Sequence, residues 1–324
     1  MPVFTDKDYK LFSKLGPRAV YGQSLLRLAE KNPQVVALSA DLGSSSGLER
    51  FRITYPNRFF DVGIAEQNLV GISAGLAKEG YIPFASSFAP FITMRAAEQV
   101  RMNLGYMHLN VKLVAIGSGL SMGFLGNSHF GLEDLAIMRS IPDLVILSPS
   151  DGLEIVKCVE AVSEFSGPVF IRLTGQPNMP IVYDHDYEFT IGKSVLLRQG
   201  SELALIATGS MVSLAIEVAS ELDKLGISTE VINMHTIKPI DTGALMNLGQ
   251  RSIPIVTIEE HSIIGGLGSA ISDYFSDSQT VTKILRIALP DQFGPTGEYS
   301  FLLDYHGLTT NKIITKILDS GLLT

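Results

Sequence analysis

Glu66 is the residue whose setting most suggests proton transfer. It follows a strand-like run that ends at Val62 and opens a stretch of small and apolar residues that reaches Ala77, a pattern that predicts a helix. Because Gly71 and Gly75 carry no side chain, another backbone can approach this helix closely, and a carboxyl group there is poorly solvated. Such a carboxyl keeps its proton more readily and can donate or accept one in a reaction. The alternative is an ordinary acid favoured at a helix N-terminus by the helix dipole.

Aromatic and histidine side chains supply further candidates. Phe88 and Phe91 lie three residues apart where a strand-like run meets a helical one, so their rings could wall a flat heteroaromatic ligand or fill the core. His129 stands in a loop before a helix and His261 follows an apolar strand, positions that suit acid–base chemistry or a structural role. The histidines lack metal-ligand spacing and Cys158 is the one cysteine, so we expect no metal site in this chain.

The glycine-rich segments do not match a nucleotide-binding motif. Residues 117–123 and 265–268 miss the spacing of the dinucleotide fingerprint, and the sequence has no P-loop. We expect these glycines to form turns at strand ends, where α/β sheets place their binding crevices.

The elements that must position these residues alternate between strand-like and helical patterns, which predicts two doubly wound α/β domains. A polar, proline-bearing segment at 174–186 separates them, so we expect a larger domain over residues 1–180 and a smaller one over residues 190–324. The strands expected in the first domain are 35–39, 59–62, 82–86, 112–116, 144–148 and 169–173, and the helices are 19–31, 66–78, 90–107, 132–140 and 152–163. In the second domain we expect strands at 203–208, 229–234, 255–259 and 284–288, and helices at 212–225, 242–248, 268–275 and 310–320.

Composition excludes several classes of partner. The 324 residues are 46% hydrophobic and carry a net charge of −8 without any cluster of Lys or Arg, which argues against nucleic acid or an anionic membrane as the main partner. The first residues lack an apolar signal core and no apolar run is long enough to span a bilayer. We therefore expect a cytoplasmic protein.

Four segments resemble the C-terminal half of the transketolases: 61–77, 132–142, 148–151 and 259–268. With Phe88 and Phe91 between them, the resemblance spans nearly the whole chain in order. It is closest to the β subunits of split transketolases, in which two polypeptides form the catalytic unit. It implies a larger pyrimidine-binding domain and a smaller transketolase C-terminal domain. The implied activity is thiamine diphosphate-dependent transfer of a two-carbon ketol unit from a ketose donor to an aldehyde acceptor.

The resemblance also assigns roles to residues of this sequence. The implied catalytic residues are Glu66, His129 and His261. The implied cofactor-binding residues are Asp41, Glu66, Phe88, Phe91 and Met94, with Glu66 facing the aminopyrimidine ring. The implied substrate-binding residues are Arg18, Ser45, His129 and His261.

The diphosphate end of the cofactor has no counterpart in this sequence. Transketolases hold it through Mg²⁺ at a Gly-Asp-Gly motif, and the motif is absent here. The resemblance therefore implies a partner α subunit that carries the diphosphate and Mg²⁺, in an α2β2 heterotetramer.

Several positions depart from the transketolase pattern. Gly117 stands where the family has a histidine, Phe124 and Leu125 where it has an acidic pair, and Gly175 where an arginine holds substrate phosphate. Because buried polar groups discriminate strongly between substrates, these changes imply a substrate that is less hydroxylated, differently anionic or unphosphorylated. One alternative is another thiamine diphosphate enzyme, such as a 2-oxo acid dehydrogenase β subunit or an acyloin-forming synthase. The other is a non-catalytic regulatory subunit.

Overall fold

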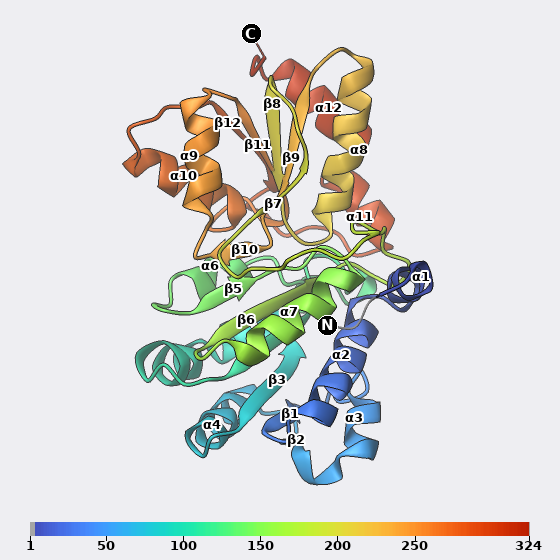
Figure 1. Cartoon of the computed structure of the whole chain (residues 1–324), viewed down its shortest axis with the longest axis vertical. Coiled ribbons are helices and arrows are strands. Elements are labelled where there is room, and N and C mark those ends of the chain that lie inside the picture. Colours follow the sequence, from blue (N-terminus) through green and yellow to red (C-terminus); the bar gives the residue numbers. More distant parts are fainter. Residues whose placement is uncertain (1–3, 324) are drawn as a thin grey trace.

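Short runs of aliphatic residues build two separate β-sheets in the computed structural model, which describes residues 4–323. The sheets follow one another along the long axis of the molecule, and helices cover both faces of each (Figure 1). This arrangement confirms the predicted pair of doubly wound α/β domains, the first with the larger sheet.

The larger sheet has seven strands, and its edge strand β10 is antiparallel to its neighbour. Their spatial order is β10 (Thr236–Lys238), β5 (Val145–Leu147), β6 (Val169–Thr174), β4 (Lys112–Ser118), β3 (Ile82–Phe88), β1 (Val35–Ser39) and β2 (Phe59–Asp61). Every residue of β1, β3, β4, β5 and β6 is buried, as expected of parallel strands covered on both faces.

The smaller sheet has five strands, and its edge strand β7 is antiparallel to β9. Their spatial order is β12 (Ile284–Leu289), β11 (Ile255–Ser262), β8 (Leu203–Ala207), β9 (Thr229–Asn233) and β7 (Val195–Arg198).

Helical segments fill the connections between the strands. The first sheet is accompanied by α1 (Asp6–Leu15), α2 (Pro17–Lys31), α3 (Glu49–Thr54), η1 (Pro56–Arg58), α4 (Glu66–Lys78), η2 (Phe91–Arg95), α5 (Ala97–Gln99), η3 (Val100–Tyr106), η4 (Gly123–Ser128), α6 (Asp134–Arg139) and α7 (Gly152–Glu164). The second is accompanied by α8 (Met211–Lys224), α9 (Thr242–Gln250), α10 (Leu267–Asp277), α11 (Tyr299–Tyr305) and α12 (Thr310–Asp319). Within the described residues, no helix combines the length and the apolar character that crossing a membrane requires.

The two halves share one hydrophobic core. A single apolar cluster runs from Leu69 on α4 through Ile146 on β5 to Leu245 on α9. Strand β10, which belongs to the second half of the chain, pairs with β5 of the first. Beside this junction the Asn233 amide donates to the buried Glu154 carboxylate at 2.9 Å. The halves are therefore joined by packing and by paired strands as well as by the chain itself.

The structure differs from the sequence-based expectation mainly in short or irregular elements. The segment 90–107 is not one regular helix, because wide π-helical turns occupy Phe91–Arg95 and Val100–Tyr106 on either side of α5. Helices α1, α3 and α11 and strands β7 and β10 were not predicted. The strand β10 has three residues, too few for a periodic pattern to show.

The carboxyl ends of the parallel strands collect the candidate functional residues at one edge of the larger sheet. Asp41 follows β1, Glu66 follows β2, and Phe88 ends β3. Gly117 lies near the end of β4 and Gly175 follows β6. Open α/β sheets bind their ligands at this edge.

Candidate active site

Glu66 opens α4 with its side chain almost wholly buried, 2% exposed. The Asp61 carboxylate accepts the Gly63 N–H at 3.0 Å, and Gly63, at a φ of 70°, turns the chain from β2 into the helix. Glu66 Oε2 accepts a hydrogen bond from Arg95 Nη1 at 2.7 Å. Its other oxygen, Oε1, has a long contact of 3.4 Å with Ser87 Oγ. The carboxylate therefore has one oxygen in a close ion pair and one that is weakly engaged.

Phe88, Phe91 and His129 form a wall of three rings near this carboxylate. The ring centroids of Phe88 and Phe91 are 6.0 Å apart, and those of His129 lie 5.6 Å from Phe88 and 5.2 Å from Phe91. All three pairs meet edge to face, a favourable arrangement for aromatic rings. Ser128 Oγ hydrogen-bonds His129 Nδ1 at 2.9 Å and helps to fix the imidazole. The structure thus brings together the aromatic pair and the loop histidine.

Asp41 and Met94 lie at the margins of this region. Asp41 is exposed and has a φ of 58°, a left-handed conformation that acidic residues tolerate better than most. Its N–H donates to Asp61 Oδ1 at 3.0 Å, so Asp61 holds the turns after both β1 and β2. Met94 follows Phe91 on η2 with 49% of its surface exposed.

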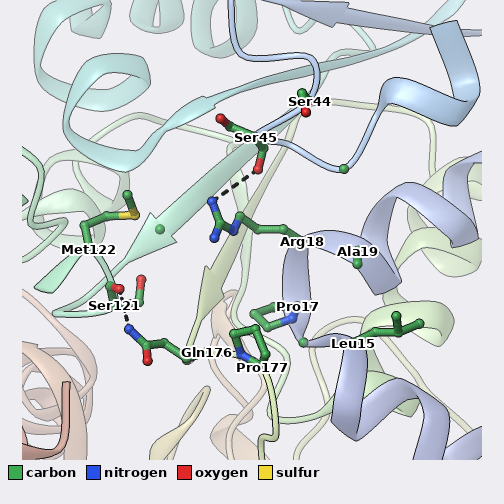
Figure 2. Close-up of a pocket in the computed structure, with 14 residues that line it drawn as sticks. Leu15, Pro17, Arg18, Ala19, Ser44, Ser45, Ser121, Met122, Gln176 and Pro177 are labelled. Atoms are coloured by element: carbon green, nitrogen blue, oxygen red, sulfur yellow. Dashed lines mark hydrogen bonds between the residues drawn. The ribbon is translucent and has the colours of Figure 1, made fainter. Parts of the chain in front are cut away.

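A pocket of about 520 Å³ opens at the same edge of the sheet, between the start of α2 and the turns after β1, β4 and β6 (Figure 2). It is lined by Leu15, Gly16, Pro17, Arg18, Ala19, Ser44, Ser45, Gly47, Gly117, Ser121, Met122, Gly175, Gln176 and Pro177. Of the first-domain residues expected to contact substrate, Arg18 and Ser45 line this pocket and His129 does not.

The pocket wall is polar but carries little charge. Arg18 is the one charged side chain among these lining residues, and its Nη1 donates to the Ser45 carbonyl at 3.3 Å. On the opposite side, Gln176 Nε2 donates to the Ser121 carbonyl at 2.8 Å (Figure 2). Gly117 lines the pocket and also lies next to the ring wall. A Cβ built on Gly117 would be 3.2 Å from the Phe88 ring.

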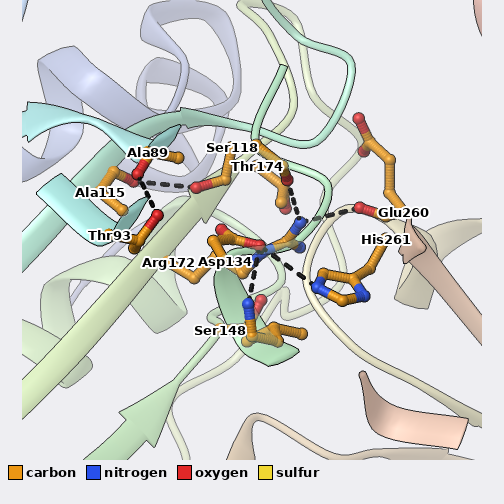
Figure 3. A network of polar contacts seen from close by, with 12 residues as sticks. Ala89, Thr93, Ala115, Ser118, Asp134, Ser148, Arg172, Thr174, Glu260 and His261 are labelled. Atoms are coloured by element: carbon orange, nitrogen blue, oxygen red, sulfur yellow. Dashed lines mark hydrogen bonds and ion pairs between the residues drawn. The ribbon is translucent and has the colours of Figure 1, made fainter. Parts of the chain in front are cut away.

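His261 lies in a different place, inside a buried polar network between the two halves (Figure 3). Its side chain is fully buried, its Nδ1 donates to the Ser262 carbonyl at 2.7 Å, and its Nε2 lies 3.6 Å from Asp134 Oδ1. Asp134 is itself paired with Arg172 Nε at 2.8 Å. Burial lowers the pKa of His261 to about 4, so the imidazole is neutral near pH 7. The structure does not bring this histidine into the ring wall.

Glu260 connects the second half of the chain to the loop after β4. Its Oε1 accepts the Leu120 N–H at 2.6 Å, and its Oε2 accepts from the hydroxyls of Ser210 at 2.6 Å and Tyr299 at 2.7 Å. Burial raises the pKa of this carboxyl. The loop that lines one side of the pocket is therefore held by a buried acid from β11.

Comparison with known proteins agrees with this geometry. Residues 13–179 match the model of the transketolase pyrimidine binding domain, and residues 192–313 match that of the transketolase C-terminal domain. The chain belongs to the transketolase family. It is 39% identical over 297 residues to a 6-deoxy-6-sulfo-D-fructose transketolase subunit of Clostridium sp. strain MSTE9, over 92% of each chain. It is 34% identical over 303 residues to one of the subunits of the apulose-4-phosphate transketolase of Phocaeicola vulgatus, over 93% of this chain and 96% of that one.

A solved structure in the transketolase family has the same architecture. It is a split gene transketolase described as an inactive β4 tetramer, with 38% sequence identity and a TM-score of 0.87. The similarity covers 95% of this chain and 99% of that one. The expected resemblance to subunits of split transketolases is thereby confirmed.

Several residues of this candidate site were not predicted. Arg95, Ser121 and Gln176 take part through contacts with segments far from them in the sequence, and no local pattern marks Ser121 or Gln176. A signal existed for Arg95: a buried glutamate needs a countercharge, and an arginine four residues after Phe91 lies on the same side of a helical segment. Within residues 4–323, no group of His, Cys, Asp and Glu is arranged to hold a metal ion.

Proposed function

We propose that this chain is the β subunit of a two-chain transketolase that moves a two-carbon ketol unit from a ketose donor to an aldehyde acceptor. The observation that carries the proposal is the buried carboxylate of Glu66 beside the rings of Phe88, Phe91 and His129, at the carboxyl edge of a doubly wound sheet. The similarity to named transketolase subunits over more than nine-tenths of the chain supports it.

Transketolases use thiamine diphosphate, and the residues present fit its aminopyrimidine end. Phe88, Phe91 and His129 offer ring surfaces to a flat ligand, and Glu66 Oε1 has only its long contact with Ser87, so a ring nitrogen can bond there. When bound, the cofactor supplies the electron sink for breaking a carbon–carbon bond. The part of this chain is to hold the ring, to exchange a proton at Glu66 and to keep water from the reacting atoms.

The diphosphate and Mg²⁺ would be held by a partner α subunit. This chain has no Gly-Asp-Gly motif, and the similar β4 tetramer is described as inactive, which supports a requirement for a second chain. We propose an α2β2 complex in which the cofactor lies between the two kinds of subunit.

The pocket at Arg18 would take the distal end of the ketose. With one cationic side chain, hydroxyl groups and an amide along its wall, it suits a substrate that ends in a single anionic group, and one similar protein is named for a sulfonated fructose.

Replacing Arg18 by Met removes the positive charge of this pocket. We expect the KM for anionic donors to rise about 10-fold or more while an uncharged donor is unaffected, because a hydrogen bond to a charged group contributes about 1.5–3 kcal/mol. Steady-state kinetics with matched donors measure the difference, and equal effects on both donors would contradict this assignment.

Product analysis of the natural complex tests the proposed reaction. The tagged chain is purified with its partner and given thiamine diphosphate, Mg²⁺, an aldehyde, and a panel of phosphorylated, sulfonated and unsubstituted ketoses or 2-oxo acids. We expect two-carbon transfer from a ketose, and a fall in kcat of about 100-fold or more in Glu66→Gln, which cannot exchange a proton at this position. Glu98→Gln is the matched control, since Glu98 is an exposed acid paired with Arg101.

Three results would contradict the proposal. Full turnover by Glu66→Gln would remove Glu66 from the chemistry. Products formed from 2-oxo acids alone would assign the chain to another class of thiamine diphosphate enzyme. A complex that binds no cofactor would make the chain a non-catalytic subunit.

A further inference from the structure

Arg95 is the countercharge of the buried Glu66. The Glu66 side chain is 2% exposed, whereas that of Arg95 is 47% exposed, and Nη1 of Arg95 lies 2.7 Å from Oε2 of Glu66. Glu66 forms no other ion pair within residues 4–323. A buried carboxylate without a countercharge is strongly unfavourable, so this contact stabilises the Glu66 carboxylate in its buried position.

Arg95 is also fixed from two other directions. Its guanidinium lies over the ring of Phe91, 4.2 Å from the centroid, a cation–π contact that helps to hold it against the wall of the site. Its backbone carbonyl accepts a hydrogen bond from Gln67 Nε2 at 3.1 Å. Together with the Glu66–Arg95 ion pair, this gives two polar contacts between α4 and η2. Arg95 ends a π-helical turn that begins at Phe91, and such turns frequently occur at functional sites.

The contacts leave the two oxygens of Glu66 unequal. Oε2 is taken by Arg95, while Oε1 has only the 3.4 Å contact with Ser87 Oγ. Rotation of the carboxyl group would break the short contact, so Arg95 determines which oxygen is available to a ligand.

From this geometry we infer that Arg95 is a positioning residue for Glu66: it binds Oε2, and thereby presents Oε1 to the ring nitrogen of the cofactor. The inference rests on the proposed function and adds a residue to it.

Few other charges act on this pair. Among the elements that pack against α4, α5 carries Glu98 and η3 carries Arg101, and these two exposed residues pair with each other at 2.9 Å. The strand β3 (Ile82–Phe88) contributes only the uncharged Ser87 at this point. Arg101→Gln is therefore a matched control, because Arg101 lies on the nearby segment η3 and its partner Glu98 is exposed.

The first experiment compares variants in the complex with the partner chain. We expect Arg95→Gln to lower kcat about 10- to 100-fold and to move the acid limb of the kcat–pH profile up by about one pH unit, since loss of the cation makes the carboxyl harder to ionise. The near-ultraviolet circular dichroism of bound thiamine diphosphate should weaken in parallel. Arg95→Lys should restore most of both signals, and Arg101→Gln should change neither.

The second experiment uses this chain alone and needs no cofactor. Arg95→Gln should lower the urea midpoint of unfolding, and adding Glu66→Gln to it should recover most of the loss, because the buried charge is then gone. Additive midpoints would mean that the two side chains do not interact, and would overturn the inference.

The outcomes separate the two proposals. If the complex of Arg95→Gln keeps the wild-type pH profile and circular dichroism, the inference about Arg95 is wrong and the proposed function stands. If the wild-type complex binds no thiamine diphosphate, the proposed function is wrong and the inference falls with it.

Discussion

At the scale of single residues, burial and countercharge together set the chemistry of this site. Removing a carboxylate from water costs several kcal/mol unless a partner compensates it, and Glu66 has that partner in Arg95 at 2.7 Å. His261 shows the opposite case. It is fully buried and its Nε2 has no hydrogen-bond partner in the described structure. The buried carboxylate of Glu66 is thus paired with a cation, whereas burial keeps the imidazole of His261 neutral near pH 7.

The neutral state of His261 makes stability depend on pH. Because its folded pKa is about 4 against an ordinary 6.5, only the unfolded chain binds this proton between those values. Stability therefore falls as the pH falls from 6.5 towards 4, by about 3 kcal/mol in total. In His261→Asn this contribution is absent. Urea unfolding at pH 7, 6 and 5 should show that the free energy of unfolding of the wild type decreases relative to that of the variant as the pH falls.

Asp151, which also titrates in this range, does not obscure the comparison. Burial raises the pKa of Asp151 to about 6, which gives a slope of opposite sign, but it does so in both proteins and cancels in the difference. A difference in unfolding free energy that stays constant from pH 7 to pH 5 would contradict the role given to His261.

At the scale of elements, the turns after the parallel strands build the site, and the loop after β4 is the most constrained of them. Gly119 has a φ of 71°, and a Cβ there would lie 2.3 Å from Glu260 Oε1. The same carboxylate holds the Leu120 N–H at 2.6 Å. Any side chain at Gly119 must therefore displace the acid that fixes the loop.

Gly119→Ala should destabilise the chain more than a change of backbone conformation alone explains. The left-handed φ costs about 1 kcal/mol for alanine, and displacing Glu260 from its hydrogen bonds adds about 1–3 kcal/mol. Gly80→Ala is the matched control, because Gly80 has a φ of 88° with nothing within 4 Å of its Cβ. Thermal or urea unfolding measures both variants, and equal losses would show that Glu260 does not hold the loop.

The elements that could be predicted from the sequence are the long ones, because only a long strand or helix shows a clear hydrophobic periodicity. The long buried strands and the helix at Glu66 have a clear periodicity, so both sheets and the placement of Glu66 and Phe88 at strand ends followed from the sequence. The break in the segment 90–107 did not, because residues in π-helical turns are the same types as in a regular helix. The buried setting of His261 also depends on contacts with Asp134 and Arg172, which lie far from it in the chain.

At the scale of the whole molecule, the two halves form one unit whose functional edge is open. Ile64 near Glu66 is 77% exposed, Phe124 in the pocket loop 69%, and Phe293 in the second half 83%. Large apolar side chains exposed next to a candidate site commonly mark a surface that another protein covers. This exposure supports the proposed partner subunit.

Binding of thiamine diphosphate tests whether this chain and a partner chain form the cofactor site together, with Glu66 as part of it. Isothermal titration with Mg²⁺ present is carried out on this chain alone, on the complex with its partner, and on the same complex with Glu66→Gln. We predict binding at least about 100-fold tighter in the complex than in the chain alone, a difference of about 2.7 kcal/mol, and a clear loss of affinity in Glu66→Gln. Equal affinity in the chain alone and in the complex, or no effect of Glu66→Gln, would contradict the account.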